Sequence, residues 1–106
     1  MRKLTGMFLL ALFLAACSAT KDDAVKAWTA CQQAVKQRLI SPASAKFPWG
    51  YSQYGNPLIA PPRAYRYAAW VDSENVFGAQ VRTYFECKIR ADGDSWVLIQ
   101  LDMKGQ

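Results

Sequence analysis

The sequence predicts an α+β fold in which one amphipathic helix packs on an antiparallel sheet of three or four strands, stapled by one disulfide. Apolar residues recur at helical spacing over 23–40 and alternate with polar residues over most of 64–103. Two cysteines lie on the apolar sides of these two regions. With 52% apolar and 20% charged residues, the composition excludes a disordered chain.

Residues 1–16 predict a lipoprotein signal peptide rather than part of the fold. Arg2 and Lys3 supply a basic start, and the apolar run over 7–14 is far shorter than the ~20 residues that cross a bilayer. The run leads into the sequence LAAC, ending at Cys17, which resembles the bacterial lipobox. That resemblance implies that Cys17 becomes the first mature residue and carries fatty acyl chains such as palmitate.

The acylated Cys17 would hold the protein in a membrane, because two or more acyl chains anchor a protein stably. In enteric-type lipoproteins an Asp after this cysteine favours inner-membrane retention, whereas Ser18 stands here. We therefore expect an outer-membrane lipoprotein that faces the periplasm or the cell surface. Residues 17–22 would be a short tether and 23–106 a single domain. The alternative is an ordinary signal peptide with Cys17 a plain residue.

The helix is predicted over 23–40 because four apolar residues fall on one stripe, at spacings of three, four and four. The stripe consists of Trp28, Cys31, Val35 and Leu39. Asp22 and Asp23 suit a helix start, and Pro42 ends the helix because the residue before a proline avoids helical geometry. The next segment, 43–63, is too rich in Pro and Gly for a long element, although a short strand around 47–54 is possible.

From Ala64 onward the apolar period changes to two, which predicts three strands. The first ends in a turn at 72–75, the second begins at Gly78, and a turn at 92–95 leads to the third, over 96–103. The residues expected to face the helix are Tyr65, Tyr67, Ala69 and Val71; Val81, Thr83, Phe85, Cys87 and Ile89; and Val97, Ile99, Leu101 and Met103.

Cys31 and Cys87 remain as an even pair once Cys17 is acylated, and an exported chain reaches an oxidising compartment. A metal site or a redox pair fits poorly, because the chain has no His and no CxxC motif. We therefore expect a Cys31–Cys87 disulfide. In the chain-entropy model, closing so long a loop is worth about 4 kcal/mol.

The residue types argue against catalysis. Without His there is no Ser–His or Cys–His relay, and no glycine-rich phosphate loop or zinc spacing appears. The carboxylates fall mostly in predicted turns or near strand ends. We therefore expect no enzyme activity, no cofactor, no metal and, because the chain is exported, no nucleic-acid partner.

Aromatic residues give the best candidate for a binding surface, since one helix and a small sheet cannot bury all of them. The candidate contacts to a protein partner are Trp49, Tyr51, Tyr54, Tyr65, Tyr67, Arg82 and Tyr84. Arg82 and Tyr84 would lie on the sheet face away from the helix, with 49–67 along its edge. The alternative, given equal weight, is that most of these aromatics complete the core.

Two stretches resemble a group of small bacterial and phage-associated domains without an assigned activity. Residues 39–48 match the pattern L-x-S-P-x-[ST]-A-x-F-P, and 71–87 match V-D-[AS]-x-N-x-[FY]-G-A-x-[VI]-R-x-x-[FY]-x-C. The resemblance implies the same fold and disulfide but no mechanism. The segment 49–63 is longer and richer in Pro and aromatics than the group's pattern, so a distinctive partner would bind there.

The expected function is that of a non-catalytic envelope lipoprotein, a binding module for an outer-membrane, secretion or phage-related protein. The alternative is a structural lipoprotein whose basic face contacts lipid or lipopolysaccharide without a specific protein partner. The whole chain carries a net charge of +5, and without Arg2 and Lys3 of the predicted signal peptide the net charge is +3.

Overall fold

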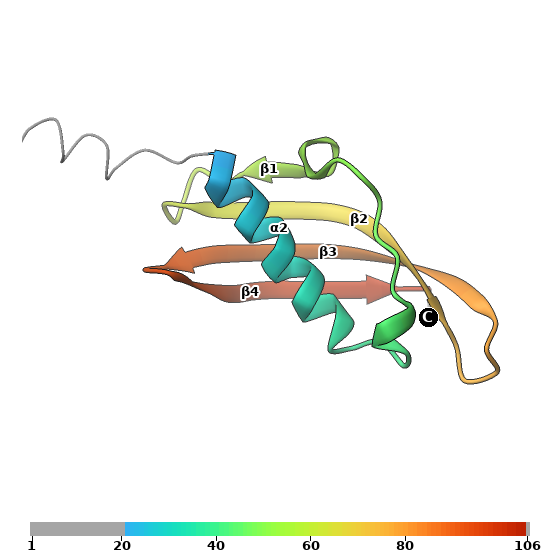
Figure 1. The fold of residues 1–106 in the computed structure, drawn as a ribbon. Helices are drawn as coiled ribbons and strands as arrows, with labels where there is room; N and C mark the ends of the chain where they lie inside the picture. Colours follow the sequence, from blue (N-terminus) through green and yellow to red (C-terminus); the bar gives the residue numbers. More distant parts are fainter. Residues whose placement is uncertain (1–20, 106) are drawn as a thin grey trace, which may run out of the picture.

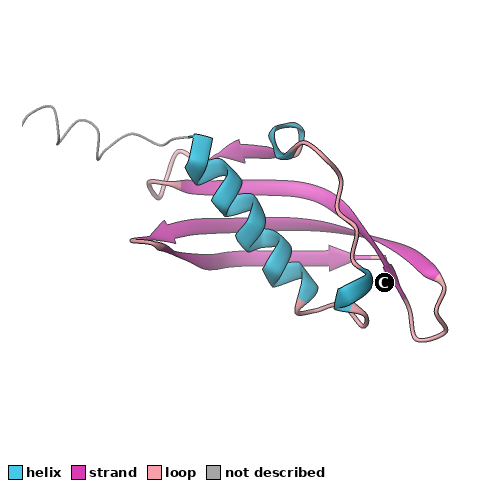
Figure 2. Ribbon diagram, viewed as in Figure 1, coloured by secondary structure: helices cyan, strands magenta, loops and turns pink. Residues whose placement is uncertain are grey.

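In the computed structural model, which describes residues 21–105, one helix lies across one face of a four-stranded antiparallel sheet (Figures 1 and 2). The helix is α2 (Lys21–Lys36), and the strands are β1 (Gly55–Pro57), β2 (Ala64–Glu74), β3 (Gln80–Asp92) and β4 (Ser95–Lys104), adjacent in that order. Two short 3₁₀ helices, η1 (Pro42–Ser44) and η2 (Tyr51–Gln53), interrupt the connection from α2 to β1. The predicted α+β fold is confirmed. The predicted signal peptide and Cys17 lie outside the described residues.

The predicted apolar stripe of the helix is buried against the sheet along its whole length. The helix itself ends at Lys36 rather than near residue 40. Beyond it the chain continues in tight turns, in which the N–H groups of Arg38 and Leu39 donate to the carbonyls three residues earlier, at 3.0 and 3.1 Å. These turns keep Leu39 in line with the stripe, so the burial pattern extends past the regular helix.

Strands β2 and β3 show the predicted alternation, with their apolar sides toward α2. The predicted turn at 72–75 is wrong, because pairing continues to Glu74 opposite Gln80. The turn occupies 75–79 instead. Asn75 determines it, since its Oδ1 accepts the N–H groups of Phe77 and Ala79 at 2.9 and 3.0 Å. Gly78 supplies the positive φ, +80°, that this turn requires.

Strand β4 departs from the predicted alternation at a β-bulge. Lys88 pairs with Gln100 but Ile89 pairs with Leu98, which leaves Ile99 as an extra residue. Leu101 and Met103 contact the core as expected, whereas Val97 and Ile99 do not belong to it. Trp96 takes the inward position and packs its ring 6.1 Å from that of Tyr65. Because side chains alternate between the two faces of a sheet, one inserted residue moves the side chain of every earlier residue in the strand to the opposite face.

The connection from α2 to β1 crosses the outer edge of β2. Lys46 and Asp72 exchange backbone hydrogen bonds of 2.8 and 3.0 Å, and Ser44 Oγ accepts the N–H of Glu74 at 2.9 Å. The strand considered around 47–54 is therefore reduced to one bridge at Lys46, with β1 beginning later. At Gly55 a Cβ atom would lie 2.1 Å from the Tyr67 ring, so only glycine lets β1 pass over that side chain.

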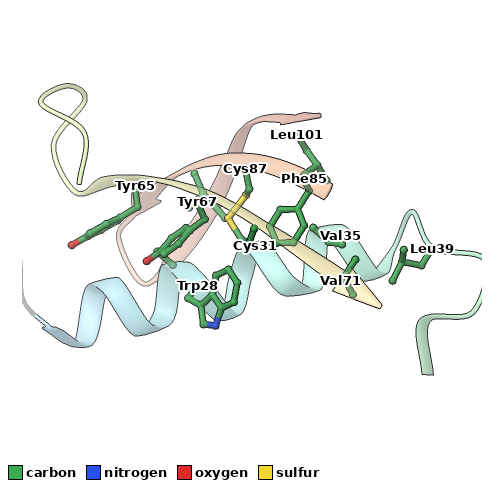
Figure 3. Packing of buried hydrophobic residues seen from close by; sticks show 13 residues of the cluster. Trp28, Cys31, Val35, Leu39, Tyr65, Tyr67, Val71, Phe85, Cys87 and Leu101 are labelled. Atoms are coloured by element: carbon green, nitrogen blue, oxygen red, sulfur yellow. A yellow bond between two sulfur atoms is a disulfide. The ribbon is translucent and has the colours of Figure 1, made fainter. Parts of the chain in front are cut away.

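The core forms between α2 and the sheet, and Figure 3 shows the residues of both layers that meet there. The Cys31–Cys87 disulfide, which joins residues 56 apart, connects the helix to β3 and confirms the prediction. The Trp28 ring lies between aromatic rings from three other segments. These are Phe47 at 6.1 Å, Tyr67 at 5.2 Å and Phe85 at 6.3 Å between centroids.

Thr83 provides a stability test within this core. Its side chain is fully buried, and its Oγ1 has no hydrogen-bond partner among residues 21–105. An unsatisfied buried hydroxyl costs roughly 1–3 kcal/mol, and valine has nearly the same shape without it. Thr83→Val should therefore raise the free energy of unfolding by about 1 kcal/mol in urea denaturation. A decrease would mean that the hydroxyl is satisfied in solution.

Candidate functional site

The strongest candidate for a binding site is a groove between α2 and the chain that follows η1. It has a volume of about 520 Å³, and one wall carries Trp49, whose side chain is 95% exposed. The residues that line it are Trp28, Gln32, Lys36, Phe47, Pro48, Trp49, Gly50 and Tyr51. We call this feature the Trp49 groove. A volume of this size falls in the range of small-ligand and peptide-side-chain pockets.

The local sequence explains why Trp49 points outward while its neighbours do not. Phe47 packs edge-on against Phe85 at 6.0 Å, and Pro48 is buried. Gly50 then adopts a left-handed conformation with φ +83°, which leads directly into η2. The residues on both sides are thus held by the fold, and the large apolar side chain between them lies in solvent.

The other wall of the groove, formed by α2, carries two polar side chains next to Trp28, one of them basic. Gln32 and Lys36 are four residues apart and therefore lie on the same side of α2. No carboxylate lines the groove, and within residues 21–105 no Asp or Glu oxygen lies within 4.0 Å of Lys36 Nζ. The groove therefore combines an aromatic surface with an uncompensated positive charge.

Comparison of this chain with protein families, curated proteins and solved structures finds no match. Among the described residues there is no group of three or more potential metal ligands, and no helix is long and apolar enough to cross a membrane.

The structure places two of the predicted contact residues in the core, as in the alternative considered for these aromatics. Tyr65 and Tyr67 are only 5% and 1% exposed, since both lie on the side of β2 that faces α2. The Tyr67 hydroxyl donates a 2.6 Å hydrogen bond to the Ala24 carbonyl of the helix. Burial raises the pKa of Tyr67 far above its usual range. Both rings therefore belong to the core, and only their edges reach the surface, where they line a pocket of about 300 Å³ beside Gly55.

Tyr51 and Tyr54 are half-buried and pack against the core. Tyr51 lines the Trp49 groove, whereas Tyr54 leads into β1 and its carbonyl accepts the N–H of Ala68 at 2.9 Å. Of the five aromatics predicted between 49 and 67, only Trp49 and Tyr51 therefore contribute to the groove.

The remaining two predicted residues, Arg82 and Tyr84, lie on the sheet face away from α2, so the structure does not bring them to the Trp49 groove. Arg82 forms two hydrogen bonds to the Asp72 carboxylate, at 2.8 and 2.9 Å, and its guanidinium lies 3.8 Å from the centre of the Trp70 ring. These hydrogen bonds lower the pKa of Asp72 and raise that of Arg82. Arg82 is therefore engaged within the fold, while Tyr84 is exposed.

Sequence reasoning missed one exposed apolar feature, the tip of the β2–β3 hairpin. Val76 and Phe77 are 72% and 89% exposed there. The available signal was an Asn-x-x-Gly turn, over 75–78, whose two middle residues are apolar. Turns at the surface usually carry polar residues at such positions, so this pair is a second candidate contact.

Proposed function

We propose that this chain is a non-catalytic binding module of the bacterial envelope, anchored in the outer membrane through acylated Cys17, and that its Trp49 groove takes a segment of a protein partner. The lipobox-like sequence supports the anchor. The observation that carries the binding role is the nearly complete exposure of Trp49 beside an aromatic groove.

The energetics favour Trp49 as the main contact. Tryptophan is among the residues that most often dominate protein–protein interfaces. Burying 150–250 Å² of aromatic surface is worth roughly 4–6 kcal/mol before the costs of association. Because Pro48 has a fixed φ and is buried, and η2 begins at Tyr51, the backbone on both sides of Trp49 is already ordered, so little backbone entropy is lost when a partner covers the side chain.

The alternative, a basic face that contacts lipid or lipopolysaccharide, receives less support from the described residues. A surface that binds anionic head groups needs basic side chains without internal partners. On the sheet face away from α2, Arg66 pairs with Glu86 at 2.7 Å and Arg82 pairs with Asp72 at 2.8 Å. Lys88 lies 4.0 Å from the same Glu86. Much of the positive charge on this face is thus compensated.

Cross-linking and purification of the tagged full-length chain from native membranes tests the proposal. We expect Trp49→Ala to reduce recovery of the dominant protein partner by about tenfold or more, the effect of a hot-spot truncation above 1.4 kcal/mol. The melting temperature should stay unchanged, because the side chain contacts little of its own chain.

Ile59→Ala is the matched control, since Ile59 is another fully exposed apolar side chain but does not line the groove. It should leave recovery unchanged. Equal recovery with Trp49→Ala and wild type would contradict the proposal. Recovery of lipid without any protein would favour the structural alternative.

A further inference from the structure

The tip of the β2–β3 hairpin presents Val76 and Phe77 at the outer end of a long projection. The hairpin extends past the C-terminal end of α2, where no other described element covers its tip (Figure 1). Two adjacent, largely exposed apolar side chains in this position have no role in the core. They would be expected at a contact with another molecule.

Hydrogen bonds hold this tip in one conformation. In addition to the two bonds that its side chain accepts, Asn75 donates its N–H to the Ala79 carbonyl at 2.8 Å, and its carbonyl accepts the N–H of Gly78 at 3.0 Å. At the base of the hairpin, Ser44 Oγ binds the N–H of Glu74. The apolar pair is therefore presented by a preorganised turn, which lowers the entropic cost of binding.

The charge beside the tip indicates what kind of surface it fits. Over residues 73–81 the only charged residue is Glu74, which is exposed. An acidic tip is repelled by anionic lipid, so it is unsuited to membrane insertion. The apolar pair and the nearby carboxylate of Glu74 are instead complementary to an apolar pocket with a basic residue at its rim.

The Trp49 groove has this chemistry: aromatic side chains on one wall, and Lys36 without an ion-pair partner among the described residues on the other. We infer that the hairpin tip of one copy of this chain inserts into the Trp49 groove of a second copy, with Phe77 against Trp49 and Glu74 facing Lys36. The inference rests on the proposed function, because it assumes that the groove takes a protein segment. In this arrangement Glu74 and Phe77 of the second copy would supply an acidic and an apolar contact to the groove.

Anchoring in one membrane would promote this contact, since copies confined to a surface meet at a high effective concentration. The interface joins two different surfaces of the chain. Two copies that exchange tips reciprocally form a closed dimer, whereas one-way insertion produces longer arrays.

Photo-cross-linking in cells tests the inference with the full-length chain. Phe77 is replaced by p-benzoylphenylalanine, and in a second variant Trp49 is replaced in the same way. Both positions should produce an adduct of the chain with itself, and the adduct from position 77 should map to 47–51 or α2. If neither variant cross-links to a second copy, the inference is overturned. An adduct from position 49 with a different protein would overturn it as well, yet leave the proposed function standing.

A charge exchange tests the residue pairing. Glu74→Lys and Lys36→Glu should each reduce the yield of the self-adduct by about tenfold, and the two together should restore it, because each single change places like charges opposite each other. Asp92→Lys and Lys26→Glu are the matched controls, on the other end of β3 and on the exposed side of α2, and should leave the yield unchanged. A double variant that remains as weak as the single ones, with unaltered melting temperatures, overturns the pairing.

Discussion

Replacing Cys31 and Cys87 together with Ala should lower the free energy of unfolding by about 4 kcal/mol, in urea denaturation at neutral pH. The disulfide closes a loop of 56 residues and therefore removes much conformational freedom from the unfolded chain. Both side chains are fully buried, so the substitution also leaves space in the core. A domain of this size has a total stability of roughly 5–15 kcal/mol, so the disulfide supplies a large fraction of it.

Changing both cysteines avoids a free thiol that could form mixed disulfides. The wild-type chain treated with a reductant is the second arm of the measurement, and it should show a loss of similar size. If the double variant unfolded within about 1 kcal/mol of the oxidised protein, helix–sheet packing alone would stabilise the fold.

Tyr67→Ala should destabilise the protein by about 3–5 kcal/mol, the usual cost of removing a large buried ring. Tyr67 lies between Trp28, at 5.2 Å, and Tyr65, at 6.4 Å between ring centroids. It also packs beneath Gly55 of β1, so the substitution removes contacts with α2 and with the edge of the sheet at once.

Tyr67→Phe measures the contribution of the hydroxyl alone, because it keeps the ring. It loses only the hydrogen bond to the Ala24 carbonyl, and a loss of about 1 kcal/mol is expected. Trp49→Ala, measured in parallel by thermal and urea unfolding, should stay within about 0.5 kcal/mol of wild type. Reversed results for Tyr67→Ala and Trp49→Ala would mean that the wrong aromatic has been assigned to the surface.

These two residues illustrate which parts of the structure could be predicted from sequence. Periodicity identifies the buried side of an element, so α2, β2, β3 and the position of Cys87 opposite Cys31 follow from local patterns. The same alternation places Tyr65 and Tyr67 beside Val71 on the inward side of β2, and their burial was predictable from it. Their assignment to a binding surface rested instead on the argument that one helix and a small sheet cannot bury all of the aromatic residues.

Features that depend on the path of the chain in three dimensions could not be predicted. The bulge at Ile99 inserts one residue into an otherwise regular alternation, and no local signal marks it. The ion pair between Asp23 and Arg63, at 2.7 Å, joins residues 40 apart and lowers the pKa of the Asp23 carboxyl. The Trp49 groove exists because the chain after η1 crosses beside α2, which the composition of 43–63 alone does not determine.

For the exported lipoprotein that we propose, the disulfide between α2 and β3 would also affect passage out of the cytoplasm. Its two cysteines lie in elements that are far apart along the chain, and thiols stay reduced in the cytoplasm. A newly made precursor of such a lipoprotein would therefore lack the covalent link that stabilises the helix on the sheet. It would be easier to unfold, and hence to pass through a translocation channel, than the oxidised domain. Formation of the disulfide after export would then stabilise the folded domain only once it had left the cytoplasm.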